Sequence, residues 1–526
     1  MNCNLINFPM FNNQALKLTL EKKLYQLILS RLDGFNIHSQ AYEEKIFQLV
    51  ERGIGGFIIF GGRRNEIKDF IHKIQSVSEI SLFIASDVEC GVGRQIQDTT
   101  LFPCQMAMAA AIDKDKASDV VILETALKAI AEESIDVGIN MPLIPVLDVN
   151  QNPDNPIVCT RAFSDKPEDV VWFGTKYIRE LEGAGLISCA KHFPGHGDTS
   201  IDSHISLPVI TKSFDELLKI DVMPFVEAIK AGVRSIMIGH LSIPAIDSKP
   251  ASLSKRIIDD LLRKKLGYDG LILTDALNMK ALKGFINVSM ECIKAGADIL
   301  LHPLDADVSV KELKAAIEEN MISEEDIDIT VSRILKAKAK IQNITTPLCP
   351  PLVRGELKGD GVGYKSHKIL SSQITDKSIT LLKDSEGLPI ADKSRVHVVL
   401  AGENKFFESS PLKTSFKHVS TISDTTKLKT KIALFAIFTS IAAWKGTSGI
   451  DDMERKQISE LIKGTKTSMV ISFGCPYVLR HFKEADVLVA AYETTEQAQR
   501  AVVNCLTREL DFKGRLPVTF NFIDNF

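Results

Sequence analysis

The chain has 526 residues, a formal net charge of -4, and hydrophobic residues make up 45% of it. This length exceeds what one ordinary core holds, so two domains, or one large barrel with a second domain, are expected. The apolar share excludes a disordered protein. The small net charge gives no reason to expect a nucleic acid or an acidic membrane surface as a partner.

The cysteines and the first residues of the chain indicate a compartment. The nine cysteines are scattered, odd in number and without a CxxC pair, so neither a disulfide framework nor a zinc site is expected and a reducing compartment fits best. The amino terminus lacks the basic start and long apolar run of a secretory signal. The most apolar run, residues 432–444, is too short to span a bilayer. We therefore expect a soluble, cytoplasmic protein with no membrane partner.

Short runs of β-branched and apolar residues recur along the first part of the chain, each followed by an amphipathic stretch. The runs are 54–60, 81–87, 136–141, 186–191, 234–240, 270–275 and 298–302. Buried strands that alternate with helices at such intervals are typical of parallel βαβ units. With an eighth strand near residues 24–35, the pattern predicts an α/β fold of the (β/α)₈ TIM-barrel type. An open doubly wound sheet is the alternative.

Almost every one of these runs ends in a polar side chain with useful chemistry or is directly followed by one. These side chains are Asp87, Glu89, Asn140, Lys191, His192, His240, Asp275 and His302. Any one of them could simply cap its strand. Barrel enzymes, however, collect their catalytic residues at the carboxyl ends of the strands, so the repetition favours an active site at one mouth of a barrel.

The barrel pattern ends after a predicted helix at residues 326–341. The segment TTPLCPPLVRGELKGDGVGYK (345–365) is rich in proline and glycine, has no apolar period, and is interpreted as a linker. A second α/β pattern follows, with strands predicted at 395–402, 431–438, 467–474 and 485–492 and a helix at 453–463. We predict a barrel domain over 1–343, a linker over 344–366, and a smaller α/β sandwich over 367–526 whose role is mainly structural.

The stretch KHFPGHGDTSIDSH (191–204) follows a predicted strand directly. Its proline and two glycines rule out a regular helix, so the stretch is a loop at a strand end. His192 and His196 are four residues apart, but without a helix they do not form the helical zinc-binding pair. A polar loop with satisfied histidines is the plainer interpretation of those two residues.

Asp202 and His204, two residues apart in the same loop, suggest proton transfer. A carboxylate that contacts an imidazole fixes its tautomer, aims the ring and favours the protonated form. Asp275 in GLILTDALNM ends another predicted strand. A lone aspartate at such a junction is as often a helix N-cap as a catalytic group, but the polar residues at the other strand ends favour catalysis.

At this point the sequence resembles a known family, the β-N-acetylglucosaminidases of glycoside hydrolase family 3. The resemblance lies in KHFPGHGDT with DSH shortly after it, and in TDALNM. Further similar segments are ASDVECGVGRQ (85–95), PVLDVNQNPDNPIVCTRAFS (145–164), GADILLHP (296–303), SITLLKDSEGLPI (378–390), SFGCPYVL (472–479) and GRLPVTF (514–520). They extend over most of the chain, including the second domain.

The resemblance implies a retaining exo-β-N-acetylglucosaminidase that needs neither metal nor cofactor. Asp275 would be the nucleophile that forms a covalent glycosyl-enzyme. His204, paired with Asp202, would act as general acid and then as general base, where most retaining enzymes use a second carboxyl group. The residues that would hold the sugar are Asp87, Arg161, Lys191 and His192.

One segment departs from the family pattern. The family often has DQEGGRVQR where this chain has DVECGVGRQ. Asp87 and Glu89 match, but Arg94 is displaced by one position, which leaves its part in binding open. His196 and Asp198 are assigned no catalytic role and are expected to brace the loop.

The implied substrate is a small carbohydrate. We expect an imported peptidoglycan fragment, N-acetylglucosamine linked β-1,4 to an anhydro-muramic unit. A family β-glucosidase and an N-acetylglucosaminide phosphorylase are alternatives, as are a non-catalytic carbohydrate-binding homologue and a metal-dependent hydrolase. The last would use His192, His196, Asp198 and His204. Whether the chain is a monomer or a homodimer stays open.

Overall fold

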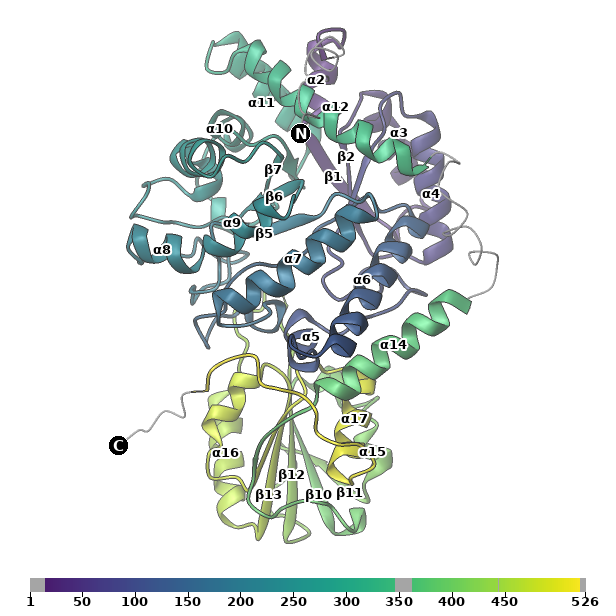
Figure 1. Cartoon of the computed structure of the whole chain (residues 1–526), viewed down its shortest axis with the longest axis vertical. Helices are drawn as coiled ribbons and strands as arrows, with labels where there is room; N and C mark the ends of the chain where they lie inside the picture. The colour runs from purple at the N-terminus through teal and green to yellow at the C-terminus, as the bar shows by residue number, and fades with distance from the viewer. Residues whose placement is uncertain (1–14, 346–361, 443, 521–526) are drawn as a thin grey trace.

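The computed structural model describes residues 15–345, 362–442 and 444–520. They form a barrel surrounded by helices and, below it in Figure 1, a smaller layered domain built on a mostly parallel sheet. Among the described residues, no helix is both long and apolar enough to cross a membrane.

Eight parallel strands of the described residues make up the barrel. They are β1 (Ile28–Asp33), β2 (Gly56–Phe60), β3 (Phe83–Ser86), β4 (Met141–Pro142), β5 (Cys189–Phe193), β6 (Ser235–Ile238), β7 (Leu271–Thr274) and β8 (Leu300–Leu301). Ladders join them in the orders β4-β3-β2-β1-β8 and β5-β6-β7. Isolated parallel bridges, Val146 with Lys191 and Leu273 with Ile299, close the two remaining gaps. The closed ring rules out the alternative of an open doubly wound sheet.

Helices surround the ring, and most of them are amphipathic and pack their apolar faces against the strands. The exception is α5 (Gln105–Ala111), whose residues are all buried and which contacts the second domain. In chain order the helices are α2 (Leu20–Gln26), α3 (Gln40–Glu51), α4 (Arg64–Val77), α5 (Gln105–Ala111), α6 (Ala117–Val137), α7 (Pro167–Gly183), α8 (Phe214–Ile220), α9 (Met223–Lys230), the π-helix η4 (Arg256–Lys265), α10 (Val288–Ala295), α11 (Ala306–Glu318) and α12 (Glu324–Thr345). Short 3₁₀ turns are η1 (Val92–Arg94), η2 (Cys159–Arg161), η3 (Ala251–Leu253) and η5 (Lys280–Leu282).

Most barrel strands lie inside the runs predicted from the sequence, but the run at 136–141 was largely wrong. Helix α6 continues to Val137 and ends at Gly138, whose φ of 98° is a left-handed conformation that suits glycine. The strand that follows is only Met141–Pro142. The eighth strand, predicted near 24–35, is β1, and a short helix, α2, precedes it.

The second domain has a six-stranded sheet in the order β11-β10-β12-β13-β14-β9. Its strands are β9 (Thr380–Asp384), β10 (Val396–Gly402), β11 (His418–Thr421), β12 (Ile432–Thr439), β13 (Thr467–Gly474) and β14 (Val487–Ala490), all parallel except β9, which runs antiparallel to β14. Its helices are α14 (Val362–Ser378), α15 (Leu412–Ser415), α16 (Asp452–Lys463) and α17 (Glu496–Leu506), with 3₁₀ turns η6 (Lys393–Arg395), η7 (Asn404–Phe406) and η8 (Pro476–His481). The two edge strands, β9 and β11, escaped the sequence prediction because they are short and incompletely buried.

The linker predicted at 344–366 falls mostly on residues 346–361, which lie outside the described residues. Helix α12 continues to Thr345 and α14 begins at Val362, so both ends of the predicted linker are helical. Helix α14 packs against α5 and α6 of the barrel and α17 of the second domain. It therefore joins the two domains along its length.

The two domains share a hydrophobic core. Met106 and Ala110 of α5, with Cys159 of the barrel, belong to the same buried cluster as Phe435 and Tyr477 of the second domain. An apolar contact of this kind fixes how the second domain sits on the carboxyl ends of the barrel strands. Segments of the second domain are thereby held beside the mouth of the barrel.

Candidate active site

A pocket of about 420 Å³ lies at the carboxyl ends of the barrel strands and extends to the second domain. Six of the seven residues that the sequence singled out for catalysis or binding line it: Asp87, Arg161, Lys191, His192, His204 and Asp275. The seventh, Asp202, is buried behind His204. The structure thus brings together side chains that come from positions almost two hundred residues apart.

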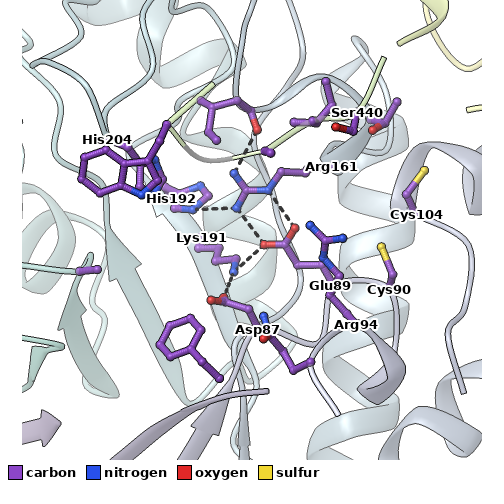
Figure 2. A pocket seen from close by; sticks show the side chains of 18 of the residues that line it. Asp87, Glu89, Cys90, Arg94, Cys104, Arg161, Lys191, His192, His204 and Ser440 are labelled. Carbon is purple, nitrogen blue, oxygen red and sulfur yellow. Dashed lines mark hydrogen bonds and ion pairs between the residues drawn. The ribbon is translucent and has the colours of Figure 1, made fainter. Parts of the chain in front are cut away.

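Four charged side chains form one network on the floor of the pocket (Figure 2). The Lys191 ammonium lies 2.6 Å from Asp87 Oδ1 and 2.7 Å from Glu89 Oε1. Arg161 donates from Nε and Nη2 to the two oxygens of Glu89, both at 2.8 Å. Burial by itself raises the pKa of Glu89, but the charges of Arg161 and Lys191 hold it well below the ordinary value. We call these four residues the charged quartet.

The quartet is held together by ion pairs, and one of its members stays accessible from the pocket. Lys191 and Arg161 each form ion pairs with carboxylates of the quartet. The Lys191 side chain is only 2% exposed, whereas the Asp87 side chain remains 33% exposed. Asp87 can therefore accept hydrogen bonds from a ligand while Lys191 holds one of its oxygens. Glu89 was noted in the sequence, but its part in holding both cations could not be read from a local pattern.

A buried carboxylate that the sequence did not single out, Asp148, orients His192. Asp148 Oδ2 lies 2.7 Å from His192 Nδ1, and Oδ1 accepts the backbone N–H groups of His192 and His196 at 3.2 and 2.7 Å. Burial raises the pKa of Asp148, and the His192 imidazole more than offsets it, so the pKa falls below its ordinary value. The ring then turns Nε2 toward Arg161 Nη2, 3.5 Å away.

His196 is a brace for the loop, as the sequence suggested. Its two ring nitrogens lie 2.8 Å from Thr199 Oγ1 and 3.1 Å from Ser203 Oγ. Burial lowers the pKa of His196 to about 4, so the ring is neutral at physiological pH. Asp198 approaches Lys212 at 3.4 Å. Within the described ranges, no three His, Cys, Asp or Glu side chains are arranged to hold a metal ion.

Asp202 and His204 form a hydrogen-bonded pair at the side of the pocket. Asp202 Oδ1 accepts from the His204 backbone N–H at 2.9 Å and lies 2.8 Å from His204 Nδ1. The Asp202 side chain is fully buried, and that of His204 is 22% exposed. Burial raises the pKa of Asp202, but the hydrogen bonds from His204 lower it by more, so the pKa lies below its ordinary value. An ionised acceptor at Nδ1 keeps the proton on that nitrogen and leaves Nε2 to the pocket.

Asp275 follows β7 and faces the same pocket. Its backbone N–H donates to Ile238 O at 2.9 Å, and its Oδ1 accepts from Ala276 N at 2.7 Å. No regular helix begins at this turn, so the N-cap interpretation fails. Burial raises the pKa of Asp275, but the imidazoles of His192, His240 and His204 lower it more, to about 2. Asp275 is therefore a carboxylate at any physiological pH.

His240 shapes the turn that carries Asp275. Its Nδ1 lies 2.8 Å from Ser252 Oγ and its Nε2 lies 3.2 Å from Ala276 O. The ring is fully buried, and burial lowers its pKa below the ordinary value. A ring that donates from Nε2 to Ala276 O fixes the backbone next to Asp275.

The second domain contributes directly to the pocket, so the expectation of a mainly structural role was wrong. Three parts of it line the pocket: the end of β12 and the residues after it (439–442 with Trp444), Gly474 at the end of β13, and residues 492–495, which follow β14. Glu493 Oε1 accepts from Cys104 N at 2.8 Å. Burial raises the pKa of Glu493 to about 7, although that hydrogen bond and the charge of Arg94 act in the opposite direction. Arg94 lines the same end of the pocket and is exposed.

Comparison with known proteins gives consistent matches. Residues 19–337 match the model of the glycosyl hydrolase family 3 N terminal domain. The β-hexosaminidase A of Pseudoalteromonas piscicida is 32% identical over 419 residues, 72% of this chain and 68% of that protein. A β-N-acetylglucosaminidase/β-glucosidase of Cellulomonas fimi is 29% identical over 352 residues, 64% of this chain and 61% of that protein.

Solved structures match over nearly the whole chain. A glycoside hydrolase family 3 β-N-acetylglucosaminidase from Paenibacillus sp. str. FPU-7 superposes with a TM-score of 0.81 at 28% identity, covering 95% of this chain and 99% of that one. A β-glucoside phosphorylase superposes with a TM-score of 0.83 at 22% identity, covering 98% of this chain and 97% of that one. The second likeness concerns the fold alone.

The raised pKa of Glu493 predicts that the stability of the protein depends on pH. The folded pKa of about 7 lies above the ordinary 4.5, so the folded state loses stability as pH rises from about 4.5 through 7. Glutamine cannot ionise, and its carbonyl can still accept from Cys104. We expect Glu493→Gln to raise the free energy of unfolding by about 2–3 kcal/mol at pH 8, with little gain at pH 5.

Thermal melting followed by circular dichroism at the two pH values measures this difference. Glu484→Gln is the matched control, because Glu484 is an exposed glutamate of the same domain. An equal gain from Glu493→Gln at both pH values would contradict the assigned burial effect.

Proposed function

Because this chain belongs to glycosyl hydrolase family 3, it is a glycoside hydrolase, and we propose that it releases terminal β-linked N-acetylglucosamine with retention of configuration. The observation that carries the proposal is one shared pocket. The ionised Asp275 and the free Nε2 side of His204, whose Nδ1 is held by Asp202, both face it. A permanent anion beside a proton carrier meets the needs of a double displacement.

Asp275 is the proposed nucleophile. A carboxylate oxygen attacks the anomeric carbon, and the ester bond to the sugar forms as the glycosidic carbon–oxygen bond breaks. The pKa of about 2 keeps the attacking oxygen ionised. The same anion, surrounded by His192, His240 and His204, also stabilises positive charge that develops on the sugar ring in the transition state.

His204 is the proposed acid and base. In the first step the imidazolium gives its Nε2 proton to the departing oxygen. In the second step neutral Nε2 takes a proton from water, whose oxygen attacks the anomeric carbon and releases Asp275. Asp202 stays ionised, as its lowered pKa requires, and stabilises the imidazolium without taking the proton itself.

The charged quartet and His192 are the proposed sugar contacts. Asp87 presents a partly exposed carboxylate suited to sugar hydroxyls, while Lys191, Arg161 and His192 supply donors for hydroxyl and amide oxygens. The pocket volume of about 420 Å³ lies at the lower end of small-molecule sites, about 300–1,000 Å³. That size suits one terminal sugar with its neighbour, which supports exo action.

As the natural substrate we propose a peptidoglycan fragment with terminal N-acetylglucosamine, taken up by a cytoplasmic enzyme. The support is the sequence resemblance across both domains together with the names of the hexosaminidase relatives. A small carbohydrate is then the partner, and neither a nucleic acid nor a membrane is proposed.

Removal of the nucleophile gives the first test. We expect Asp275→Ala to lower kcat/KM for para-nitrophenyl N-acetyl-β-glucosaminide on the order of 10⁴-fold or more. Added azide can replace the carboxylate as attacking group, so glycosyl azide with the α configuration should appear by NMR. Asp269→Ala is the control, since Asp269 is an exposed carboxylate just before β7, at the other end of the barrel. Turnover retained by Asp275→Ala would remove the nucleophile assignment.

Removal of the proton carrier should depend on the leaving group. A dinitrophenolate leaves without protonation, whereas a sugar or alkoxide needs a proton. We expect His204→Ala to reduce kcat/KM for an N,N′-diacetylchitobiose substrate on the order of 10²–10⁴-fold and to change the dinitrophenyl glycoside value far less. His72→Ala, which alters an exposed histidine of α4, is the control. Equal losses for both substrates would mean that His204 is not the acid.

Phosphorolysis is the alternative that one observation favours. The proposed proton carrier is an imidazole, and an imidazole does not repel an incoming phosphate as a carboxylate would. Turnover of aryl N-acetylglucosaminide is therefore measured with and without inorganic phosphate, beside the matching glucoside. We expect free N-acetylglucosamine as product, no acceleration by phosphate, and slower release from the glucoside. Glycosyl phosphate in the product would replace the hydrolase proposal with a phosphorylase.

A further inference from the structure

A segment of the second domain reaches across the pocket to the proposed acid/base pair. We call residues 440–442 and 444–446, which follow β12, the strap. The backbone N–H of Trp444 donates to Asp202 Oδ2 at 2.9 Å. The indole ring lies 5.4 Å from the His204 imidazole, centre to centre, with the two planes inclined at 62°. Both members of the pair are therefore in contact with one residue of the other domain.

The strap is seated on the barrel at further points. Gly446 has a φ of 72°, and a Cβ placed there would lie 2.9 Å from the Ile205 side chain, so the strap packs closely on the residue next to His204. On the barrel side, Lys280 donates its N–H to His204 O at 3.4 Å, and its ammonium lies 5.3 Å from the centre of the Trp444 ring. The indole is thus held between the His204 segment and Lys280.

A carboxylate of the second domain braces both ends of the strap. Glu403, which follows β10, accepts from Ser440 Oγ at 2.8 Å and from Lys445 Nζ at 2.7 Å, and Lys445 also donates to Ser440 O at 2.8 Å. Burial raises the pKa of Glu403, but the hydrogen bonds from Lys405, Lys445 and Ser440 lower it to about 2. The brace therefore stays charged at physiological pH.

The backbone of Trp444 is itself held in an uncommon conformation. Its φ of 70° is left-handed, which is unfavourable for a bulky residue and persists only where the surroundings enforce it. The Trp444 side chain is nevertheless 45% exposed, so burial of the ring alone does not account for the conformation. The hydrogen bond to Asp202 and the contacts that Glu403 makes with the strap hold Trp444 in this conformation.

We propose that Trp444 is a positioning residue for the Asp202–His204 pair, so that the second domain completes the proton-transfer apparatus of the barrel. Asp202 Oδ1 receives both bonds from His204, and Oδ2 receives the bond from Trp444. Without the strap, a buried carboxylate oxygen would lose its partner and the carboxylate would turn to find another. The indole also shields the imidazole from water. This inference rests on the proposed acid/base role of His204.

The test compares kcat and KM for a good and a poor leaving group. We expect Trp444→Ala to lower kcat for chitobiose hydrolysis on the order of 10- to 100-fold, with a much smaller loss for the dinitrophenyl glycoside. Trp444→Ala and Trp444→Phe both keep the backbone N–H that donates to Asp202, so they test the ring that packs beside His204. Trp444→Phe, which keeps an aromatic ring, should recover most of the rate. Glu403→Gln should give a smaller loss with the same leaving-group dependence.

Controls separate this inference from the function on which it rests. Glu454→Gln is matched to Glu403→Gln, because Glu454 is a half-buried carboxylate that accepts from Gly402 N at 3.0 Å beside the same strand end; it should leave both rates unchanged. If His204→Ala shows no leaving-group dependence, the proposed function fails. Two results would overturn the positioning role while leaving the proposed function intact. In the first, His204→Ala shows leaving-group dependence and Trp444→Ala does not. In the second, Trp444→Ala only raises KM, and by the same factor for both substrates.

Fluorescence reports where the strap lies. The chain contains two tryptophans, and the other, Trp172, packs against Phe173 on α7, away from the pocket. In a Trp172→Phe background, Trp444 is the sole tryptophan, and excitation at long wavelength avoids the tyrosines. We expect Glu403→Gln to shift its emission to longer wavelength as the strap leaves the barrel. Unshifted emission together with an unchanged chitobiose rate would overturn the brace.

Discussion

A buried charge is stable only when it is paired, and at the mouth of this barrel the pairs join segments that are distant in sequence. Glu89, just after β3, holds Lys191 of β5 and Arg161 of η2. Asp148 holds the turn after β5 through His192 and His196. Because each carboxylate pairs with groups from another segment, the site exists only where the closed barrel brings these segments together. The geometry of the pocket is therefore a direct product of the topology.

The second domain also contacts the pocket through segments that are distant in sequence. Its sheet shares an apolar core with α5 and η2, and α14 packs on helices of both domains. This rigid contact brings two loops to the pocket: one carries Trp444 to Asp202, and the other carries Glu493 to Cys104. A domain that adds no strand to the barrel thereby donates one hydrogen bond to Asp202 and accepts another from Cys104 at the pocket.

The sequence predicted those features that depend on local pattern. Apolar runs gave the barrel strands, and polar residues at their ends located Asp275, Lys191 and His192. Features that depend on tertiary contacts were not predicted from the sequence. Asp148 lies outside any strand. Nothing near it in the sequence reveals that it accepts hydrogen bonds from the backbone N–H groups of two histidines. Trp444 ended an apolar run that indicated only a buried segment, and Gly138 stopped a helix where a strand was predicted.

The charged quartet has a consequence for the medium in which the protein works. Two carboxylates and two cations add to zero, and they are paired at short range in a site largely shielded from solvent. Dissolved salt screens exposed charges over a Debye length of about 8 Å at physiological strength but screens such buried pairs much less. A neutral sugar that docks on the quartet releases no counterions. If the quartet binds sugar as proposed, the affinity for a neutral sugar is expected to be largely independent of ionic strength.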